Sequence, residues 1–123
     1  MLKYMLDTNI VIYTMKNKPD SVRERLKKHH GRMCISSITF MELVYGAERS
    51  SNPDRNLTSL EGFVARMDVL SLDDSSAAHA GQIRAELARF GMPIGPYDQL
   101  IAGHARSQGL VLVNNNEKEF ARV

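Results

Sequence analysis

The stretch MLDTN, Met5–Asn9, places a carboxylate at the end of a short apolar run near the start of the chain. Residues 1–6, MLKYML, have the apolar content of a short strand, and an acid, a hydroxyl and an amide follow it directly. In open parallel sheets, ligands bind beyond the carboxyl ends of the strands. If the rest of the chain builds such a sheet, we expect Asp7 in a crevice at its rim.

Strand-like and helix-like segments alternate along the chain. Short apolar segments typical of strands follow at 33–35, 68–72 and 110–113. Longer segments with helical periodicity lie between them, at 21–30, 36–48, 57–67, 75–90 and 97–108. Residues 8–17 suit either a helix or an extension of the first strand. This order predicts an α/β protein, a parallel sheet covered by helices, in one domain that spans residues 1–123.

Local signals refine the segments in the middle of the chain. Ile38, Met41 and Tyr45 recur at helical spacing, which predicts that they share one face of the helix at 36–48. Residues 49–56, RSSNPDRN, have the composition of a surface loop.

Signals for helix ends are clear in the second half. Asp73 or Asp74 is a candidate cap for the helix at 75–90, and Pro96 stands where a first helical residue is favoured. Gly109 is expected to end the helix at 97–108.

The composition is typical of a folded, soluble domain with a hydrophobic core. The 123 residues are 43% hydrophobic and 24% charged, with a net charge of +2, which is too small by itself to indicate a nucleic-acid partner. The single cysteine, Cys34, lies between apolar residues and excludes an internal disulfide. No apolar run approaches the ~20 residues of a membrane span, and no signal-peptide core is present. We therefore expect a cytoplasmic protein.

Three acids stand in apolar surroundings on three different elements. They are Asp7, Glu42 inside a predicted helix, and Asp98 just after Pro96. An unpaired carboxylate in such surroundings is costly, and three around one point would repel each other. A divalent cation removes that repulsion, and Mg²⁺ or Mn²⁺ takes oxygen ligands of this kind. The three acids are therefore a candidate metal site.

Each acid also has a purely structural interpretation. Asp7 could cap the following helix, Glu42 lies three residues after Thr39 as in a capping box, and Asp98 could complement a helix dipole. Asn114–Asn116 could form an ordinary polar turn. For His79 and His104 we expect packed or solvated side chains rather than metal ligands. Only the joint pattern of the acids favours a site.

Four segments together resemble the PIN-domain ribonucleases, and within them the VapC toxins of toxin–antitoxin pairs. The segments are MLDTNI, SSITFMELVYGAE, IGPYDQLIAGHA and LVNNNEKEF, and they follow the order of the family. The resemblance implies a three-layer α/β/α sandwich with a parallel central sheet. It also implies that Asp7, Glu42 and Asp98 bind Mg²⁺ or Mn²⁺ and that the protein is a metal-dependent endoribonuclease.

The resemblance assigns further residues to the site. Asn116 stands where the family often has a fourth acid or an asparagine and would join the catalytic set, and Glu119 matches an acid before the closing phenylalanine. Thr8 and Asn9 would line the corner after the first strand. Asn114 departs from the family, which usually has Thr or Ser there to orient the attacking water. Close relatives also continue a few residues further, so the domain is expected to be shortened at its C-terminus.

The resemblance further implies a reaction and partners. Water would attack a phosphodiester of RNA, expected to be transfer RNA in its anticodon region, leaving a 5′-phosphate and a 3′-hydroxyl and inhibiting translation. Candidate RNA contacts are Arg84, Arg89 and Arg106, which otherwise need no explanation beyond a solvated helix face. A VapB antitoxin would hold the toxin inactive, within a larger complex that contains a toxin homodimer.

Two alternative functions remain at this point. The chain could be a PIN-like module that binds an antitoxin or RNA without cleavage, as Asn114 suggests. It could also be a phosphoacceptor receiver domain, which likewise has aspartates at the rim of a parallel sheet. That alternative is disfavoured, because Asp7 has no adjacent acid and the DVLSLDD segment is a poor acceptor context.

Overall fold

The computed structural model describes residues 1–17, 28–29, 31–92 and 94–114. Its sheet contains β1 (Tyr4–Leu6), β2 (Met33–Ser36), β3 (Asp68–Leu70) and β4 (Val111–Val113) in the order β3-β2-β1-β4, with all pairings parallel. Leu6 is in register with Ile35 on one side and with Val113 on the other. The strand ends that carry the polar segments therefore lie next to each other, as the sequence predicts.

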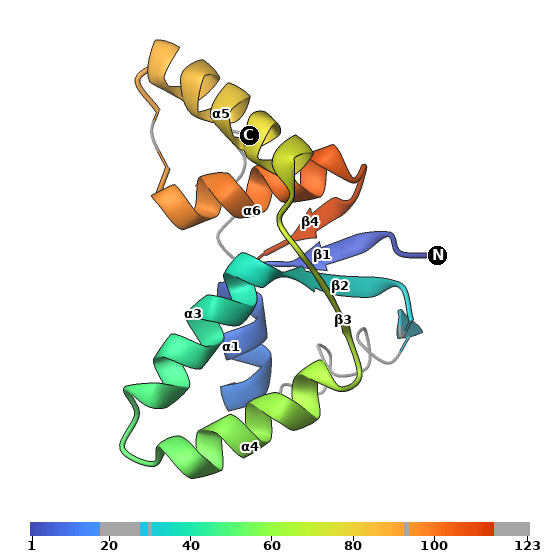
Figure 1. The fold of residues 1–123 in the computed structure, drawn as a ribbon, viewed down its shortest axis with the longest axis vertical. Helices are drawn as coiled ribbons and strands as arrows, with labels where there is room; N and C mark the ends of the chain where they lie inside the picture. Colours follow the sequence, from blue (N-terminus) through green and yellow to red (C-terminus); the bar gives the residue numbers. More distant parts are fainter. Residues whose placement is uncertain (18–27, 30, 93, 115–123) are drawn as a thin grey trace.

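Helices cover both faces of the sheet, which makes a three-layer α/β/α sandwich (Figure 1). The helices α1 (Thr8–Asn17), α3 (Ser37–Glu48) and α4 (Pro53–Val64) lie on one face, and α5 (Asp74–Arg89) and α6 (Pro96–Ser107) lie on the other. The predicted fold class is confirmed. None of the helices in the described part of the chain is long and apolar enough to cross a bilayer.

Alternation along the strands explains why both faces are buried. Leu6 and Ile35 pack with Leu43 and Leu60 in the core between the sheet and the helices α1, α3 and α4. Their neighbours Met5 and Cys34 point to the other side, where they pack with Ile101 of α6. The interpretation of Cys34 as a small buried hydrophobe is confirmed, since burial and, to a lesser extent, the Asp68 carboxylate raise the pKa of its thiol to about 11.

Several predicted boundaries are confirmed. Residues 8–17 form a helix rather than a strand extension. The Asp73 carboxylate accepts a 2.8 Å hydrogen bond from the backbone N–H of Ser76, so Asp73 is the cap of α5. Pro96 begins α6, and Gly109 follows its end with a φ of 66°, which glycine adopts without strain. The predicted strand at 68–72 is shorter, and the predicted helix at 21–30 lies almost entirely outside the described residues.

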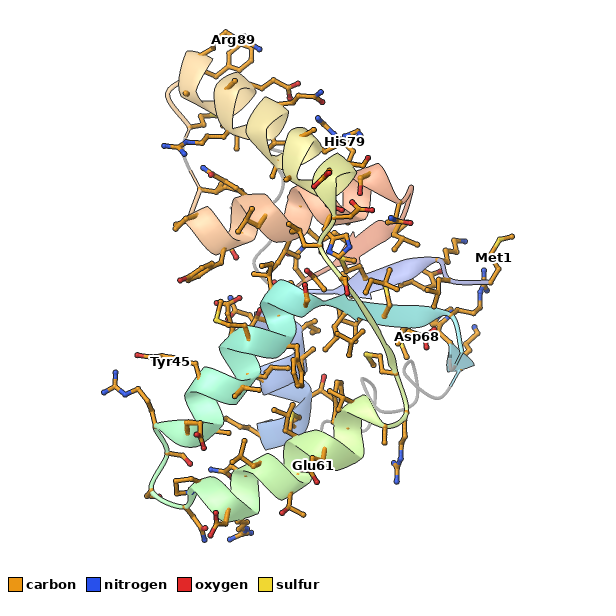
Figure 2. The ribbon with its side chains drawn as sticks, viewed as in Figure 1. Met1, Tyr45, Glu61, Asp68, His79 and Arg89 are labelled. Carbon is orange, nitrogen blue, oxygen red and sulfur yellow. The ribbon has the colours of Figure 1, made fainter. Side chains whose placement is uncertain are left out.

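The face predicted for α3 is not its buried side, and one prediction about the start of α4 is wrong. The buried side of α3 consists of Thr39, Leu43 and Ala47, whereas Met41 and Tyr45 are 40% and 58% exposed, and Figure 2 shows Tyr45 on the outer side of the helix. Because α3 has apolar residues all round, its hydrophobic pattern does not reveal the side that packs. Residues 49–56 are also not entirely loop, since α4 already begins at Pro53.

The contact between α5 and α6 requires a glycine. A Cβ atom at Gly103 would collide with the backbone nitrogen of Ala80 and lie 2.5 Å from its Cα atom. We expect Gly103→Ala to lower the free energy of unfolding by about 1–3 kcal/mol, because backbone cannot yield as a flexible side chain does. Gly81→Ala is the matched control on α5, where an added Cβ would meet nothing within 4 Å. It should be neutral or stabilising by up to about 1 kcal/mol in urea denaturation.

Candidate active site

Asp7 follows β1 directly and is almost completely buried, with 1% of its surface exposed. Its Oδ1 atom accepts a 2.8 Å hydrogen bond from the backbone N–H of Ile10 in α1. Asp7 is therefore the helix cap that the sequence allowed as an alternative. The cap does not exclude a second role, because a carboxylate can accept about four hydrogen bonds or metal contacts through its two oxygens.

Glu42 is bound to Thr8, the residue that follows Asp7 in the sequence. The hydroxyl of Thr8 donates a hydrogen bond of 2.6 Å to Oε1 of Glu42, and Thr39 Oγ1 lies 3.2 Å from the same hydroxyl. A short bond to a carboxylate fixes the orientation of the half-buried Glu42 side chain. The capping-box interpretation of Glu42 is wrong, because α3 begins one turn earlier and is capped by Ser36, as the apolar start of this segment suggests.

Asp98 reaches the same edge of the sheet from the opposite layer. A short turn joins the end of α6 to the start of β4, so α6 runs antiparallel to the strands and begins at their carboxyl edge. Ile101, one turn after Asp98, lies in the core cluster that contains Met5, which is two residues before Asp7. Asp98 is also in the first turn of α6, so its charge complements the helix dipole as well.

Asn114 is the last described residue at this edge. The backbone N–H of Asp7 donates a 2.9 Å hydrogen bond to the carbonyl of Val113, so Asp7 and Asn114 follow adjacent, bonded strand ends. Asn9 is exposed in the first turn of α1. Asn116 and Glu119 lie outside the described residues.

The donor atoms at this edge are of the kind that a hard cation prefers. Residues with carboxylate, hydroxyl and amide side chains follow the ends of β1 and β4, and the site residues named above include neither a thiol nor an imidazole. Within the described residues, no three His, Cys, Asp or Glu side chains are grouped closely enough to hold an ion by themselves. Mg²⁺ does not require such a cage, since it keeps several waters and binds through one or two carboxylates.

Comparison with known proteins places this arrangement in a family. A family model described as PIN domain matches residues 4–123. The chain belongs to the PIN-domain family. It is 66% identical to the tRNA(fMet)-specific endonuclease VapC of Shigella flexneri, over the whole chain and 93% of that protein.

Solved structures agree with this assignment at the level of the fold. The crystal structure of DNA-bound VapBC from Salmonella typhimurium matches this PIN domain with a TM-score of 0.98 and 63% identity, over the whole chain and 93% of its own. VapBC2 from Rickettsia felis, bound to a promoter DNA fragment, matches with a TM-score of 0.95 and 36% identity, over 99% and 93%. Within the family, the chain is therefore a VapC-type PIN domain.

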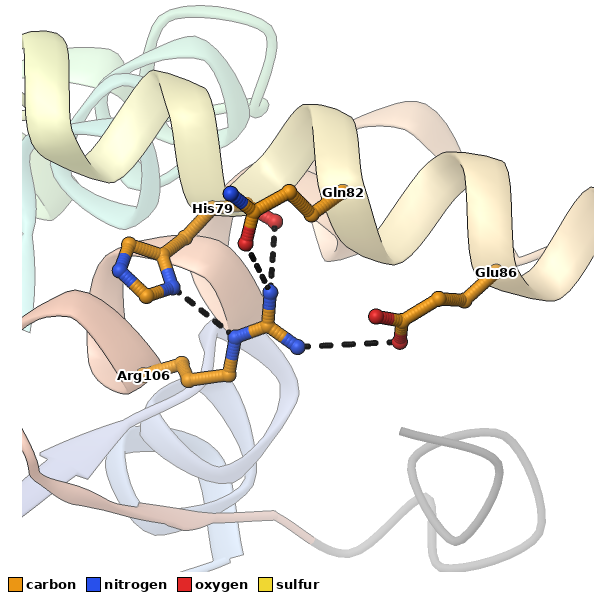
Figure 3. Close-up of polar contacts among 4 residues, drawn as sticks. All are labelled: His79, Gln82, Glu86 and Arg106. Atoms are coloured by element: carbon orange, nitrogen blue, oxygen red, sulfur yellow. Dashed lines mark hydrogen bonds and ion pairs between the residues drawn. The ribbon is translucent and has the colours of Figure 1, made fainter.

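Of the candidate RNA contacts, Arg106 of this PIN domain is exposed but already bound to other side chains of the same chain (Figure 3). Its Nε atom donates to Nδ1 of His79 at 3.0 Å and Nη2 donates to Oε1 of Gln82 at 2.8 Å, while Nη1 lies 3.7 Å from Oε2 of Glu86. The planar guanidinium thus binds three side chains of α5 and ties α6 to it. Arg84 and Arg89 are exposed on α5, with Arg89 at its far end (Figure 2).

These arginines should differ in their effect on RNA binding by the PIN domain. Log affinity for RNA falls as log salt concentration rises. If Arg84 and Arg89 contact phosphates, Arg84→Gln and Arg89→Gln should each make this negative slope shallower by about 0.7. Arg106→Gln should leave that slope unchanged and lower the free energy of unfolding by about 1 kcal/mol. Fluorescence anisotropy with labelled RNA at several salt concentrations measures the slope. If only Arg106→Gln makes the salt dependence shallower, then Arg106 contacts the RNA and Arg84 and Arg89 do not.

His104 is packed, as expected, but its partner was not foreseeable from local sequence. The ring is fully buried, and its Nδ1 atom lies 2.8 Å from the hydroxyl of Ser36, 68 residues away. Burial lowers the pKa of His104, against a smaller opposing effect of the Asp73 carboxylate, so we infer a neutral ring at neutral pH. Ser36 is the residue that sequence reasoning missed, because no periodicity links the end of a strand to a distant helix.

Proposed function

We propose that this VapC-type PIN domain is a divalent-metal-dependent endoribonuclease that cleaves a transfer RNA. The main support from the structure is that Asp7 and Asp98 stand on elements that end or begin at the carboxyl edge of one parallel sheet, with Glu42 bound to Thr8 at the same edge. The main support from comparison is the 66% identity to a relative named for cleavage of tRNA(fMet). We take tRNA(fMet), cut in its anticodon region, as the first substrate to test, and the cytoplasm, where it is found, as the location.

The residues of the chain prepare the site in two ways. Asp7 and Asp98 would bind the cation directly, with Mg²⁺ or Mn²⁺ as the fitting ions. Glu42, held by Thr8, would bind it or accept a proton from the attacking water. When bound, the cation would lower the pKa of water and offset charge on the phosphate oxygens. Asn9, Asn114, Asn116 and Glu119 would line the site and contact its water and the RNA.

A cleavage assay tests this function. The purified chain, free of other proteins, is incubated with end-labelled tRNA(fMet) and Mg²⁺ or Mn²⁺, and the products are separated on a denaturing gel. We expect one main cut in the anticodon region, with a 5′-phosphate and a 3′-hydroxyl at the new ends, and no cut in EDTA. An elongator methionine tRNA is the matched substrate control.

The same assay separates the alternative of a binding module, which Asn114 favours. Tight binding of tRNA with no cleavage in either metal would reject the enzyme and support that module. Cleavage of both methionine tRNAs at equal rates would keep the nuclease and reject the proposed specificity.

We also propose that the protein works within an antitoxin complex. The solved relatives from Salmonella typhimurium and Rickettsia felis are VapBC structures, which supports a VapB-type antitoxin as partner. Phe40, Met41 and Tyr45 on α3 are 37%, 40% and 58% exposed and offer an apolar surface for assembly, including a toxin homodimer. Addition of the cognate antitoxin should stop cleavage, and light scattering of the free and bound protein should reveal the dimer.

A further inference from the structure

A buried hydrogen bond joins the two helices that carry Glu42 and Asp98. The Ser36 hydroxyl, at the end of β2, lies 2.8 Å from Nδ1 of His104 in α6, and both side chains are 0% exposed. Complete burial keeps substrate away from this serine and histidine, so they do not form a nucleophile and base. Their position in the fold indicates a different role.

Ser36 controls the start of α3. Its Oγ atom accepts a 3.1 Å hydrogen bond from the backbone N–H of Ile38, which makes it the cap of the helix. Glu42 lies less than two turns further along α3, where it is bound to Thr8. The oxygen that fixes the first turn of α3 is therefore the same oxygen that holds His104.

The bond also lies beside Asp7. Leu6 and Ile35 are paired in register, so Asp7 and Ser36 are the next residues at the ends of two adjacent strands. By alternation, both side chains leave the sheet on the face where Met5 packs with Ile101 of α6. His104 therefore meets Ser36 next to the strand end that carries Asp7, and Asp98 precedes His104 by less than two turns of α6.

The hydrogen-bond roles follow from the number of protons. The Ser36 oxygen already accepts from Ile38, so the most complete arrangement has its proton donated to Nδ1 of His104, with the ring proton on Nε2. Nε2 is buried and has no hydrogen-bond partner among the described residues. The histidine therefore buries one nitrogen without a partner, and the hydrogen bond between its Nδ1 atom and the Ser36 hydroxyl has to offset that cost.

We propose that His104 is a positioning residue, which acts through Ser36 to set the spacing between α6 and α3. This spacing decides whether Asp98 can share a cation with Asp7 and Glu42. The proposal rests on the proposed nuclease function. It predicts that loss of the bond harms cation binding and catalysis more than it harms the binding of RNA.

Two variants at His104 separate the bond from the packing. His104→Leu fills a similar volume without a polar atom, and His104→Asn keeps an amide near the position of Nδ1. We expect His104→Leu to lower kcat for tRNA cleavage by about tenfold to a hundredfold and to weaken Mn²⁺ binding by about tenfold. KM for the tRNA should change by less than about twofold, and His104→Asn should recover most of both losses.

Ser107→Ala is the matched control on the same helix. The Ser107 hydroxyl donates a 2.8 Å hydrogen bond to the backbone carbonyl of His104 and lies 3.0 Å from the hydroxyl of Ser76. This variant therefore breaks one bond within α6 and one contact with α5, but it leaves the bond between the His104 ring and Ser36 in place. We expect a lower Tm for Ser107→Ala, with kcat and Mn²⁺ affinity as in the parent. Circular dichroism and cooperative melting confirm that each variant is folded before it is compared.

The outcomes distinguish this inference from the function on which it rests. A parent protein that neither binds Mn²⁺ nor cleaves RNA overturns both. An active parent with a folded His104→Leu variant of equal kcat and equal Mn²⁺ affinity overturns only the role of His104. The role is also rejected if His104→Asn is as impaired as His104→Leu, because the bond to Ser36 would then not be the cause.

Discussion

Asp7→Asn is expected to reduce metal-dependent cleavage by at least about a hundredfold, with little change in stability. An asparagine keeps the oxygen that accepts the hydrogen bond from Ile10 but loses the negative charge that would bind the cation. The loss should therefore lie in kcat and in Mn²⁺ affinity, measured by single-turnover cleavage and by calorimetry. Binding of the RNA without metal should stay equal or improve, since a repulsive charge is removed.

Asp7→Ala is the control for the structural role of this side chain. It removes the charge and also the helix cap, so it should cost about 1 kcal/mol of stability in addition to the activity. If Asp7→Asn cleaves as fast as the parent, the acid serves α1 only, and the proposed metal site is wrong.

Thr8→Val is expected to lower cleavage by about tenfold to a hundredfold, although Thr8 itself need not touch the substrate. The variant keeps the shape of the side chain and loses the 2.6 Å hydrogen bond that orients Glu42. Losses of this size are typical when a residue that orients a metal ligand is removed. Single-turnover rates over a range of Mg²⁺ concentrations measure the effect, which excess Mg²⁺ should partly relieve.

Two further variants are the controls for Thr8→Val. Thr8→Ser retains the hydroxyl and should cleave at nearly the parental rate. Thr39→Val removes a buried hydroxyl 3.2 Å from Thr8 that is not bonded to Glu42, so it should affect stability more than cleavage. Equal loss of cleavage in Thr39→Val and Thr8→Val would show that general packing, and not the orientation of Glu42, is responsible.

Features fixed by local chemistry could be predicted from the sequence. The cap at Asp73 and the helix start at Pro96 depend on neighbouring backbone groups, so their residue types identify them. The place of Asp7 at the rim follows from the alternation of strands and helices, which requires a parallel sheet. The start of α4 carried the same kind of signal, Asn52 followed by Pro53, but the composition of the segment favoured a loop.

Features fixed by distant contacts could not be predicted. The exposed side of α3 depends on which neighbours cover it, and an apolar residue such as Tyr45 gives no indication of that. The bond from Thr8 to Glu42 spans 34 residues, and the bond from Ser36 to His104 spans 68. Such pairs can be identified only once the positions of the helices on the sheet are known. The sequence therefore did not reveal the hydrogen bonds from Thr8 to Glu42 and between Ser36 and His104.

The most direct test of the account is a crystal structure of the protein with Mn²⁺, in which anomalous scattering locates the ion. We predict one strong peak at the carboxyl edge of β1, with carboxylate oxygens of Asp7 and Asp98 about 2.0–2.6 Å away. Glu42 should bind the ion directly or through a water. A peak elsewhere, or none at a Mn²⁺ concentration that supports cleavage, would contradict the claim that these acids share a cation.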